Sequence, residues 1–141
     1  MLPNRSIPNC TVIPELVYED PGKAAEWLCD AFGFSVRLEI GNHRVQLNVG
    51  DGAIVVKEGS GSHATGGAAD CRHSVMVRIP DVDSHYQQAV SRGARVVREP
   101  ADHPFGERQY TVEDLGGHLW TFTQSIADVD PRDWGGTPRQ L

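Results

Sequence analysis

The residues of this 141-residue sequence that could do chemistry are mainly histidines and arginines, and their spacing favours binding over catalysis. Five histidines are scattered through expected turns, loops and one helix: His43, His63, His85, His103 and His118. They lack the His-x-x-x-His spacing that places two metal ligands on one helical face, so we interpret them as solvated or locally hydrogen-bonded side chains. Arg78 and Arg108 could each hold a carboxylate or phosphate through two parallel hydrogen bonds. The alternative is an ion pair with a nearby acid such as Glu113 or Glu107.

Strand parity predicts which polar side chains line a cavity, because alternate residues of a strand point to opposite faces. If the apolar residues of 45–49 face a helix, the polar residues between them face inward, and the same holds near 74–78 and 119–123. Arg108 and Tyr110 share one face of their strand, but the apolar Val112 shares it too. Parity therefore does not decide which face of this strand lines the cavity. A few convergent polar groups in an apolar cavity are typical of a small-molecule site. The expected ligand-binding residues are Gln46, Asn48, Ser74, Met76, Arg78, Arg108, Tyr110 and Thr121.

Two copies of one unit, a strand, a helix and three strands, must position these residues. In each copy an aspartate that can cap a helix is followed by a glycine that can end it: Asp20 and Gly33, then Asp81 and Gly93. The second copy ends in the hairpin YTVEDLGGHLWTFTQ, residues 110–124, in which a glycine pair marks the turn. This self-similarity predicts a tandem repeat of one βαβββ module.

The chain is expected to form a single domain of the α+β class. Module one is expected at about residues 10–57, a flexible linker at about 58–72, module two at about 73–125, and a polar tail at about 126–141. The linker is rich in Gly, Ser and Ala and has no apolar period. Trp27 and Trp120 occupy helix-facing positions and are expected in the core. A loop at 100–108 presents Phe105 as a candidate lid residue.

The composition limits the possible partners. A formal net charge of −6 argues against nucleic acid, which needs clustered Lys and Arg. No apolar run approaches membrane-spanning length, and the N-terminus lacks the pattern of a secretion signal. Three widely spaced cysteines, Cys10, Cys29 and Cys71, fit a reduced compartment, so we expect a cytoplasmic location.

The paired modules, together with DVDSHYQQAVSRGARVV and FGERQYTVEDLGGHLWTF, resemble the vicinal-oxygen-chelate superfamily over residues 10–125. This superfamily includes glyoxalase I, extradiol dioxygenases and bleomycin-resistance proteins. The Asp-x-x-Gly-His-x-Trp pattern is similar to its PhnB-like and uncharacterised glyoxalase-like branch. The resemblance implies a cupped mixed β-sheet, a half-barrel with the helices on its outer face, and a homodimer.

The resemblance also implies four positions at which relatives bind a divalent ion through His, Gln or Glu. Here these positions fall on Ile13, Val56, Ser74 and Thr121, which offer two apolar side chains and two hydroxyls. We therefore expect no metal and no other cofactor. A register slip that substitutes His73 for Ser74 is excluded, because it would turn the apolar residues of that strand away from the helix.

Two functions follow as alternatives. The first is a metal-free protein that binds a small organic molecule in the cup. The second is a metal-dependent lyase, isomerase, epimerase or dioxygenase that uses displaced ligands, namely Glu15 and Glu58 with the help of Gln46. A third alternative is that the site is vestigial and no longer binds a ligand. One scaffold hosts many chemistries, so the resemblance alone does not choose between them; the missing donors favour the first.

Overall fold

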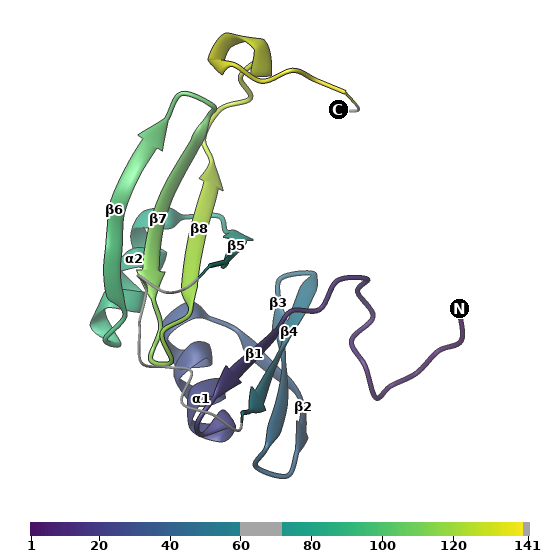
Figure 1. Ribbon diagram of the computed structural model, residues 1–141. Coiled ribbons are helices and arrows are strands. Elements are labelled where there is room, and N and C mark those ends of the chain that lie inside the picture. The colour runs from purple at the N-terminus through teal and green to yellow at the C-terminus, as the bar shows by residue number, and fades with distance from the viewer. Residues whose placement is uncertain (60–71, 140–141) are drawn as a thin grey trace.

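Two successive βαβββ modules make up the fold in the computed structural model, which describes residues 1–59 and 72–139 (Figure 1). The first module consists of β1 (Glu15–Tyr18), α1 (Pro21–Phe32), β2 (Ser35–Ile40), β3 (Arg44–Val49) and β4 (Gly52–Glu58). The second consists of β5 (Ser74–Arg78), α2 (Val82–Ser91), β6 (Arg95–His103), β7 (Glu107–Glu113) and β8 (Leu119–Ser125). A short 3-10 helix, η2 (Pro131–Trp134), follows.

Each module builds one four-stranded mixed sheet with the same strand order. Sheet A runs β1-β4-β3-β2 and sheet B runs β5-β8-β7-β6. The first strand of each module is parallel to the last, whereas the other neighbours are antiparallel. The α+β class and the tandem βαβββ architecture predicted from the sequence are therefore confirmed.

Both helices begin directly after the aspartates that the repeat identified, and α1 ends at the expected Gly33, whereas α2 ends one residue before the expected Gly93, with Arg92 as its cap. The Asp20 carboxylate accepts a hydrogen bond from the Lys23 amide at 3.1 Å, and Asp81 accepts from the first turn of α2 in the same way. Gly33 ends α1 with a φ of +81°, a conformation that costs a residue with a side chain more than it costs glycine.

Two strand boundaries differ from the expectation. Module one was expected from about residue 10, but β1 begins only at Glu15, because Pro14 lies just before it and cannot donate to a ladder. β6 continues to His103, so most of the loop expected at 100–108 is strand. Two register shifts against β7 accommodate Pro100 in this edge strand.

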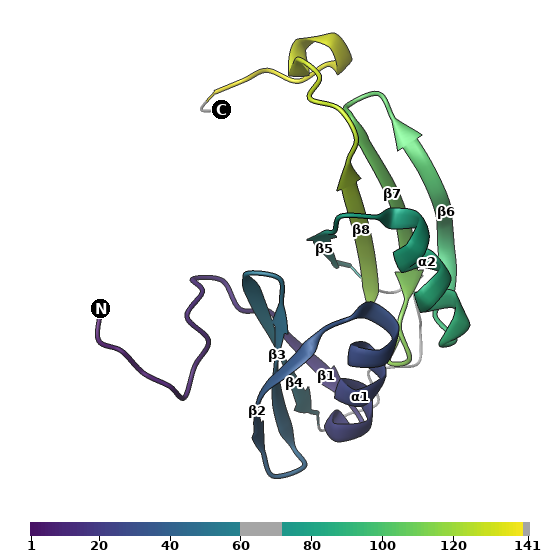
Figure 2. The same cartoon turned by 180° about the vertical axis from the view of Figure 1, so that it is seen from behind.

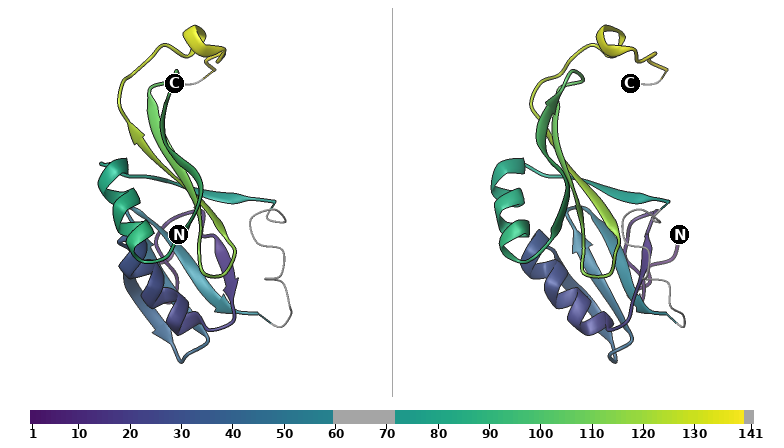
Figure 3. Two further views of the ribbon diagram at one scale, coloured as in Figure 1. Left: turned by 90° about the vertical axis from the view of Figure 1, so that its left-hand side faces the viewer. Right: turned by 60° about the vertical axis from the view of Figure 1, so that its left-hand side comes forward.

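The core lies between the helices and the sheets and runs through both modules. Figure 3 shows α1 and α2 following one another on one side of the two sheets. Phe32, at the end of α1, packs against Trp120 and Phe122 of sheet B with ring centroids 5.4 and 4.8 Å apart. Trp120 is fully buried, and Trp27 is half-buried and donates to the Arg92 carbonyl at 2.7 Å. Both tryptophans thus contribute to the join between modules.

The segments outside the modules are described only in part. Apart from its ends, at residues 58–59 and 72, the expected linker lies outside the described residues. Along the tail, Trp134 of η2 packs edge-on against Phe105 of the β6–β7 loop at 5.5 Å, so Phe105 anchors the tail. Within the described ranges, no helix has the length and apolar character needed to cross a membrane.

Candidate functional site

The candidate site is the face of each sheet that the helices leave uncovered, called here the helix-free face. On sheet A, alternation and register place Val55, Gln46 and Asn48 on this face, opposite Leu47 and Val56, which pack in the core. On sheet B, Ser74, Met76 and Arg78 of β5 take the same side as Thr121 and Thr123 of β8. Six of the eight expected ligand-binding residues therefore lie on helix-free faces, divided between the two sheets.

The polar groups of sheet A are held by neighbours. Gln46 is only 3% exposed, and its amide donates to the Ser6 carbonyl at 2.8 Å. Arg37 donates to the other end of the same amide. Asn48 donates to the Ser35 hydroxyl at 3.2 Å. The side-chain amides of Gln46 and Asn48 are thus already engaged by neighbouring groups.

Sheet B presents a more open surface with a hydroxyl network. The hydroxyls of Thr121 and Thr111 are hydrogen-bonded at 2.9 Å, and Thr123 donates to Glu107 at 2.6 Å. Beside them Met76 is 61% exposed. This combination of exposed apolar surface and hydrogen-bonding groups is suited to an organic ligand.

The expectation that Arg108 and Tyr110 line the cup is wrong, because both lie on the opposite face against α2. Arg108 bonds Asp83 at 2.9 Å and Asp102 at 2.9 Å, rather than either glutamate expected as its partner. The hydrogen bonds with Asp102 and Asp83 raise the pKa of its guanidinium. Tyr110 is fully buried and its hydroxyl bonds His85, while burial raises its pKa.

Some residues of the helix-free faces were not identified from the sequence. On β7 the alternation places Glu107, Gln109 and Thr111 there, and Gln109 donates to Glu107 at 3.0 Å. The polar alternation of these three residues could have revealed this face. Arg37 could not have been found this way, because the register shift between Val36 and Leu38 breaks the parity of β2.

The residues at the metal positions of the superfamily do not fit a divalent ion. Ile13 precedes β1, and the hydroxyl of Thr121 is bonded to Thr111. The assignment of Val56 is wrong by one residue: Val56 is buried under α1, and Val55 occupies the helix-free face. Since valine also lacks a donor atom, the four positions still supply two apolar groups and two hydroxyls.

The displaced ligand set does not assemble either. Glu15 lies on the helix-free face and pairs with Arg44 at 2.6 Å and Lys57 at 3.3 Å, which lower its pKa, Arg44 most strongly. Glu58 is three residues from the partner of Glu15 in β4 and so points to the other face. In residues 1–59 and 72–139, no three His, Cys, Asp or Glu side chains are grouped as metal ligands.

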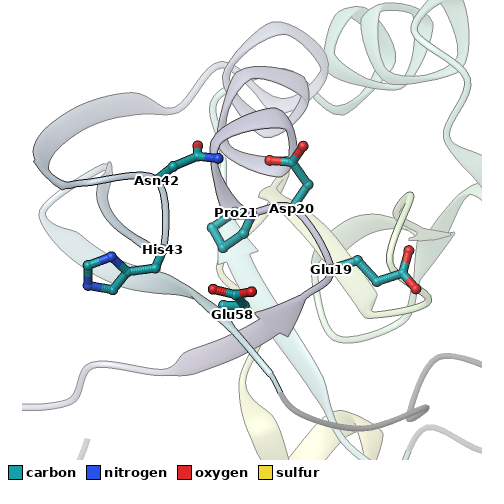
Figure 4. Close-up of a pocket in the computed structure, with 6 residues that line it drawn as sticks. All are labelled: Glu19, Asp20, Pro21, Asn42, His43 and Glu58. Carbon is teal, nitrogen blue, oxygen red and sulfur yellow. The ribbon is translucent and has the colours of Figure 1, made fainter.

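A separate pocket of about 320 Å³ lies at the N-terminus of α1, where Glu58 lies beside Pro21 while the His43 ring points away from both (Figure 4). Its lining also includes Glu19, Asp20 and Asn42. Asp20 is engaged as the cap of α1, and the pocket is on the helix side of sheet A. It therefore does not extend the helix-free face.

The repeated module and its uncovered sheet faces define the class of protein. The Glyoxalase/Bleomycin resistance protein/Dioxygenase superfamily matches residues 9–122, and the chain belongs to this superfamily. The crystal structure of TioX from Micromonospora sp. ML1 is similar, with 35% identity, a TM-score of 0.68, and coverage of 84% of this chain and 100% of that one. The genomically encoded fosfomycin resistance protein FosX from Listeria monocytogenes shares the fold at 14% identity, with a TM-score of 0.66 and coverage of 82% and 93%.

Curated relatives match a shorter part of the chain. An uncharacterized protein of Mycobacterium tuberculosis (strain ATCC 25618 / H37Rv) is 33% identical over 57 residues, which is 40% of this chain. A counterpart in Mycobacterium bovis has the same identity over the same length. The chain spans 34% and 38% of the length of these two relatives, about a third.

Proposed function

We propose that the protein binds a small organic molecule on the helix-free faces of its sheets and that it does so without a divalent metal ion. The observation that carries this proposal is the helix-free face of sheet B, where exposed Met76 adjoins Arg78 and the hydroxyls of Thr121 and Thr123. Such a surface can bury apolar ligand atoms and fix their orientation through a few polar contacts.

Arg78 supplies the strongest single contact in this proposal. In the part of the chain that the structure describes, its guanidinium has no ion-pair partner, unlike Arg108 and Arg44. A free guanidinium favours a carboxylate, a phosphate or a polarised carbonyl on the ligand. The apolar and hydroxyl residues at the superfamily's metal positions support binding without a metal.

A homodimer is part of the proposal. The helix-free faces are open to solvent at Ser74, Met76 and Arg78, and a second copy would supply a wall opposite them. Enclosure matters because ligand sites normally bury most of the ligand surface.

The test is native mass spectrometry and elemental analysis of protein purified without chelators. We expect a co-purifying organic molecule, with metal well below stoichiometric amounts. Arg78→Ala should lower ligand occupancy about tenfold, equivalent to on the order of 1.4 kcal/mol. Arg92→Ala, an exposed arginine at the end of α2, is the matched control and should retain the ligand. Stoichiometric metal, or unchanged occupancy in Arg78→Ala, would overturn the proposal.

A further inference from the structure

The N-terminal strap, residues 5–8, lies along the helix-free face of sheet A. Figure 2 shows the N-terminal segment on the side of this sheet that is opposite α1. Pro8 is buried, whereas Arg5, Ser6 and Ile7 are exposed. The strap is therefore held at one end by packing and elsewhere by its backbone.

Backbone carbonyls make the contacts of the strap with the sheet. Arg37 donates to the carbonyls of Arg5 and Ile7 at 3.3 and 3.1 Å. Gln46 donates to the carbonyl between them, that of Ser6, at 2.8 Å. Arg37 also donates to the Gln46 side-chain oxygen, which turns the Gln46 amino group toward the strap. We call Arg37 and Gln46 the carbonyl clamp.

The positive charge of Arg37 in the clamp is not balanced by an anionic group of the strap. A guanidinium stays protonated at all physiological pH values and forms its strongest hydrogen bonds with carboxylates or phosphates. Across the described residues, the recorded acceptors of Arg37 are neutral oxygens. Residues 5–8 bring no negative charge to Arg37, because the charged side chain among them is that of Arg5. An anionic oxygen at this position would interact with Arg37 more strongly than the carbonyls do.

We propose that the carbonyl clamp is a subsite for a carboxylate next to an amide carbonyl, and that the strap occupies it until such a ligand displaces it. Arg37 would hold the carboxylate through its fork of N–H donors, and Gln46 would donate to the amide carbonyl as it now does to Ser6. Ligand displacement of the strap rests on the proposed function. The attachment of the strap to the clamp does not.

The attachment is tested on the ligand-free full chain by limited trypsin digestion. Arg5 lies in the strap, so the rate of cleavage after Arg5 reports how often the strap detaches. Gln46→Ala removes one hydrogen bond to the strap and should accelerate this cleavage about tenfold, since a tenfold change corresponds to the loss of about one hydrogen bond. Arg37→Gln removes the guanidinium that bonds two strap carbonyls and should accelerate it at least as much. Asn48→Ala is the matched control, because Asn48 lies on the same face of β3 but donates to Ser35. Equal cleavage rates in Gln46→Ala and Asn48→Ala would overturn the strap contact.

The ligand class is tested with N-acetylglycine and its neutral counterpart, N-acetylglycinamide, at matched ionic strength. Concentrations reach the millimolar range, in which such small ligands bind. We expect N-acetylglycine to accelerate cleavage after Arg5 in the wild type and not in Arg37→Gln, and the amide to act about tenfold more weakly. No acceleration, or equal effects of both probes, would overturn the subsite. Neither result alters the Arg78-dependent occupancy, so failure of the subsite is distinguishable from failure of ligand binding.

Discussion

Asp114 is a buried carboxylate that joins the two modules. It is 1% exposed, and one of its oxygens accepts from Tyr18 of β1 at 2.5 Å and from Trp120 at 2.9 Å. Its other oxygen accepts from the amides of Gly116 and His118 at 2.9 and 3.0 Å. His118 in turn bonds the Val17 carbonyl at 2.8 Å. The Asp-x-x-Gly-His-x-Trp pattern is therefore a structural element that shapes the last hairpin and attaches it to β1.

Substitution Asp114→Asn should destabilise the fold by about 2–4 kcal/mol. Every partner of Asp114 is a donor, so an asparagine amino group must oppose one of them and leave buried groups unpaired. Urea unfolding followed by far-UV circular dichroism measures the loss. Asp51→Asn, in the exposed β3–β4 turn, is the control. A loss similar to that of the control would show that the carboxylate does not hold the hairpin.

His85 should make the stability depend on pH. Its Nε2 donates to the Phe32 carbonyl at 2.9 Å, because a carbonyl can only accept, and its Nδ1 therefore accepts from the Tyr110 hydroxyl. Burial lowers the pKa of His85, although the Phe32 hydrogen bond opposes this effect. With the folded pKa below the unfolded value, this stability is present above the unfolded pKa of about 6.5 and is lost as the pH falls below it.

The measurement is urea unfolding between pH 7.5 and 5.0. His85→Phe removes two hydrogen bonds and should lower the free energy of unfolding by about 1–2 kcal/mol at the higher pH. On acidification, the free energy of unfolding of this variant should decline less steeply than that of the wild type. Tyr110→Phe removes one of these bonds while keeping the imidazole, so it should retain the steep decline. Parallel pH profiles for the wild type and His85→Phe would contradict this account.

At the scale of the element, the sequence predicts the order of helices and strands well, but it predicts less reliably which face of each strand points toward the helices. Cap residues and hydrophobic period located α1, α2 and most strands within a few residues, because these signals are local. Strand parity correctly predicted which residues of β3, β5 and β8 lie on the helix-free faces. It did not decide the face of β7, and the choice of Arg108 and Tyr110 as lining residues was wrong: polar Arg108 lies on the core face with Tyr110 and Val112 because α2 supplies Asp83 as its partner. That pairing depends on tertiary contacts that no local pattern encodes.

The candidate site was predictable only in part, for the same reason. Alternation predicted six residues on the helix-free faces. Arg37 could not be predicted in this way, because a register shift in β2 places it on the helix-free face of sheet A. The strap was missed because it is held there by residues more than 25 positions away in the sequence. The assignment of Val56 was wrong because an offset of one residue along a strand reverses the face to which the side chain points.

The β6–β7 loop provides a prediction at this scale. Gly106 has a φ of +85°, and a Cβ there would clash with the Ala127 carbonyl oxygen. Gly106→Ala should therefore destabilise the tail by more than the roughly 1 kcal/mol that the left-handed conformation alone costs. Gly50→Ala is the matched control, with a φ of +57° and open space around the added carbon. Tryptic cleavage after Arg132 reports detachment, and equal cleavage in both variants would contradict the clash.

At the scale of the whole molecule, the two modules share one core instead of packing as separate units. Phe32 contributes from α1 to the aromatic cluster of sheet B, and α2 contacts α1 through polar links as well. Gln88 donates to the Asp30 carbonyl at 2.7 Å, and Trp27 donates to the Arg92 carbonyl at 2.7 Å. This continuity fixes the relative positions of the helix-free faces of sheets A and B, on which the proposed ligand site depends.

Because the two modules share one core, we expect the chain to unfold in a single transition. Phe32 should be the residue that couples the unfolding of the two modules. In the wild type, tryptophan fluorescence and far-UV circular dichroism should give coincident urea curves. Phe32→Ala should cost about 3–5 kcal/mol, since it opens a cavity between the modules, and should separate the two curves because each module then loses its main contact with the other. Phe105→Ala, in a half-buried aromatic contact outside the core, is the control and should cost less while leaving the curves coincident. Coincident curves in Phe32→Ala would mean that the hydrogen bonds of Asp114 and His85 suffice to couple the modules, and the double variant with Asp114→Asn would then measure their share.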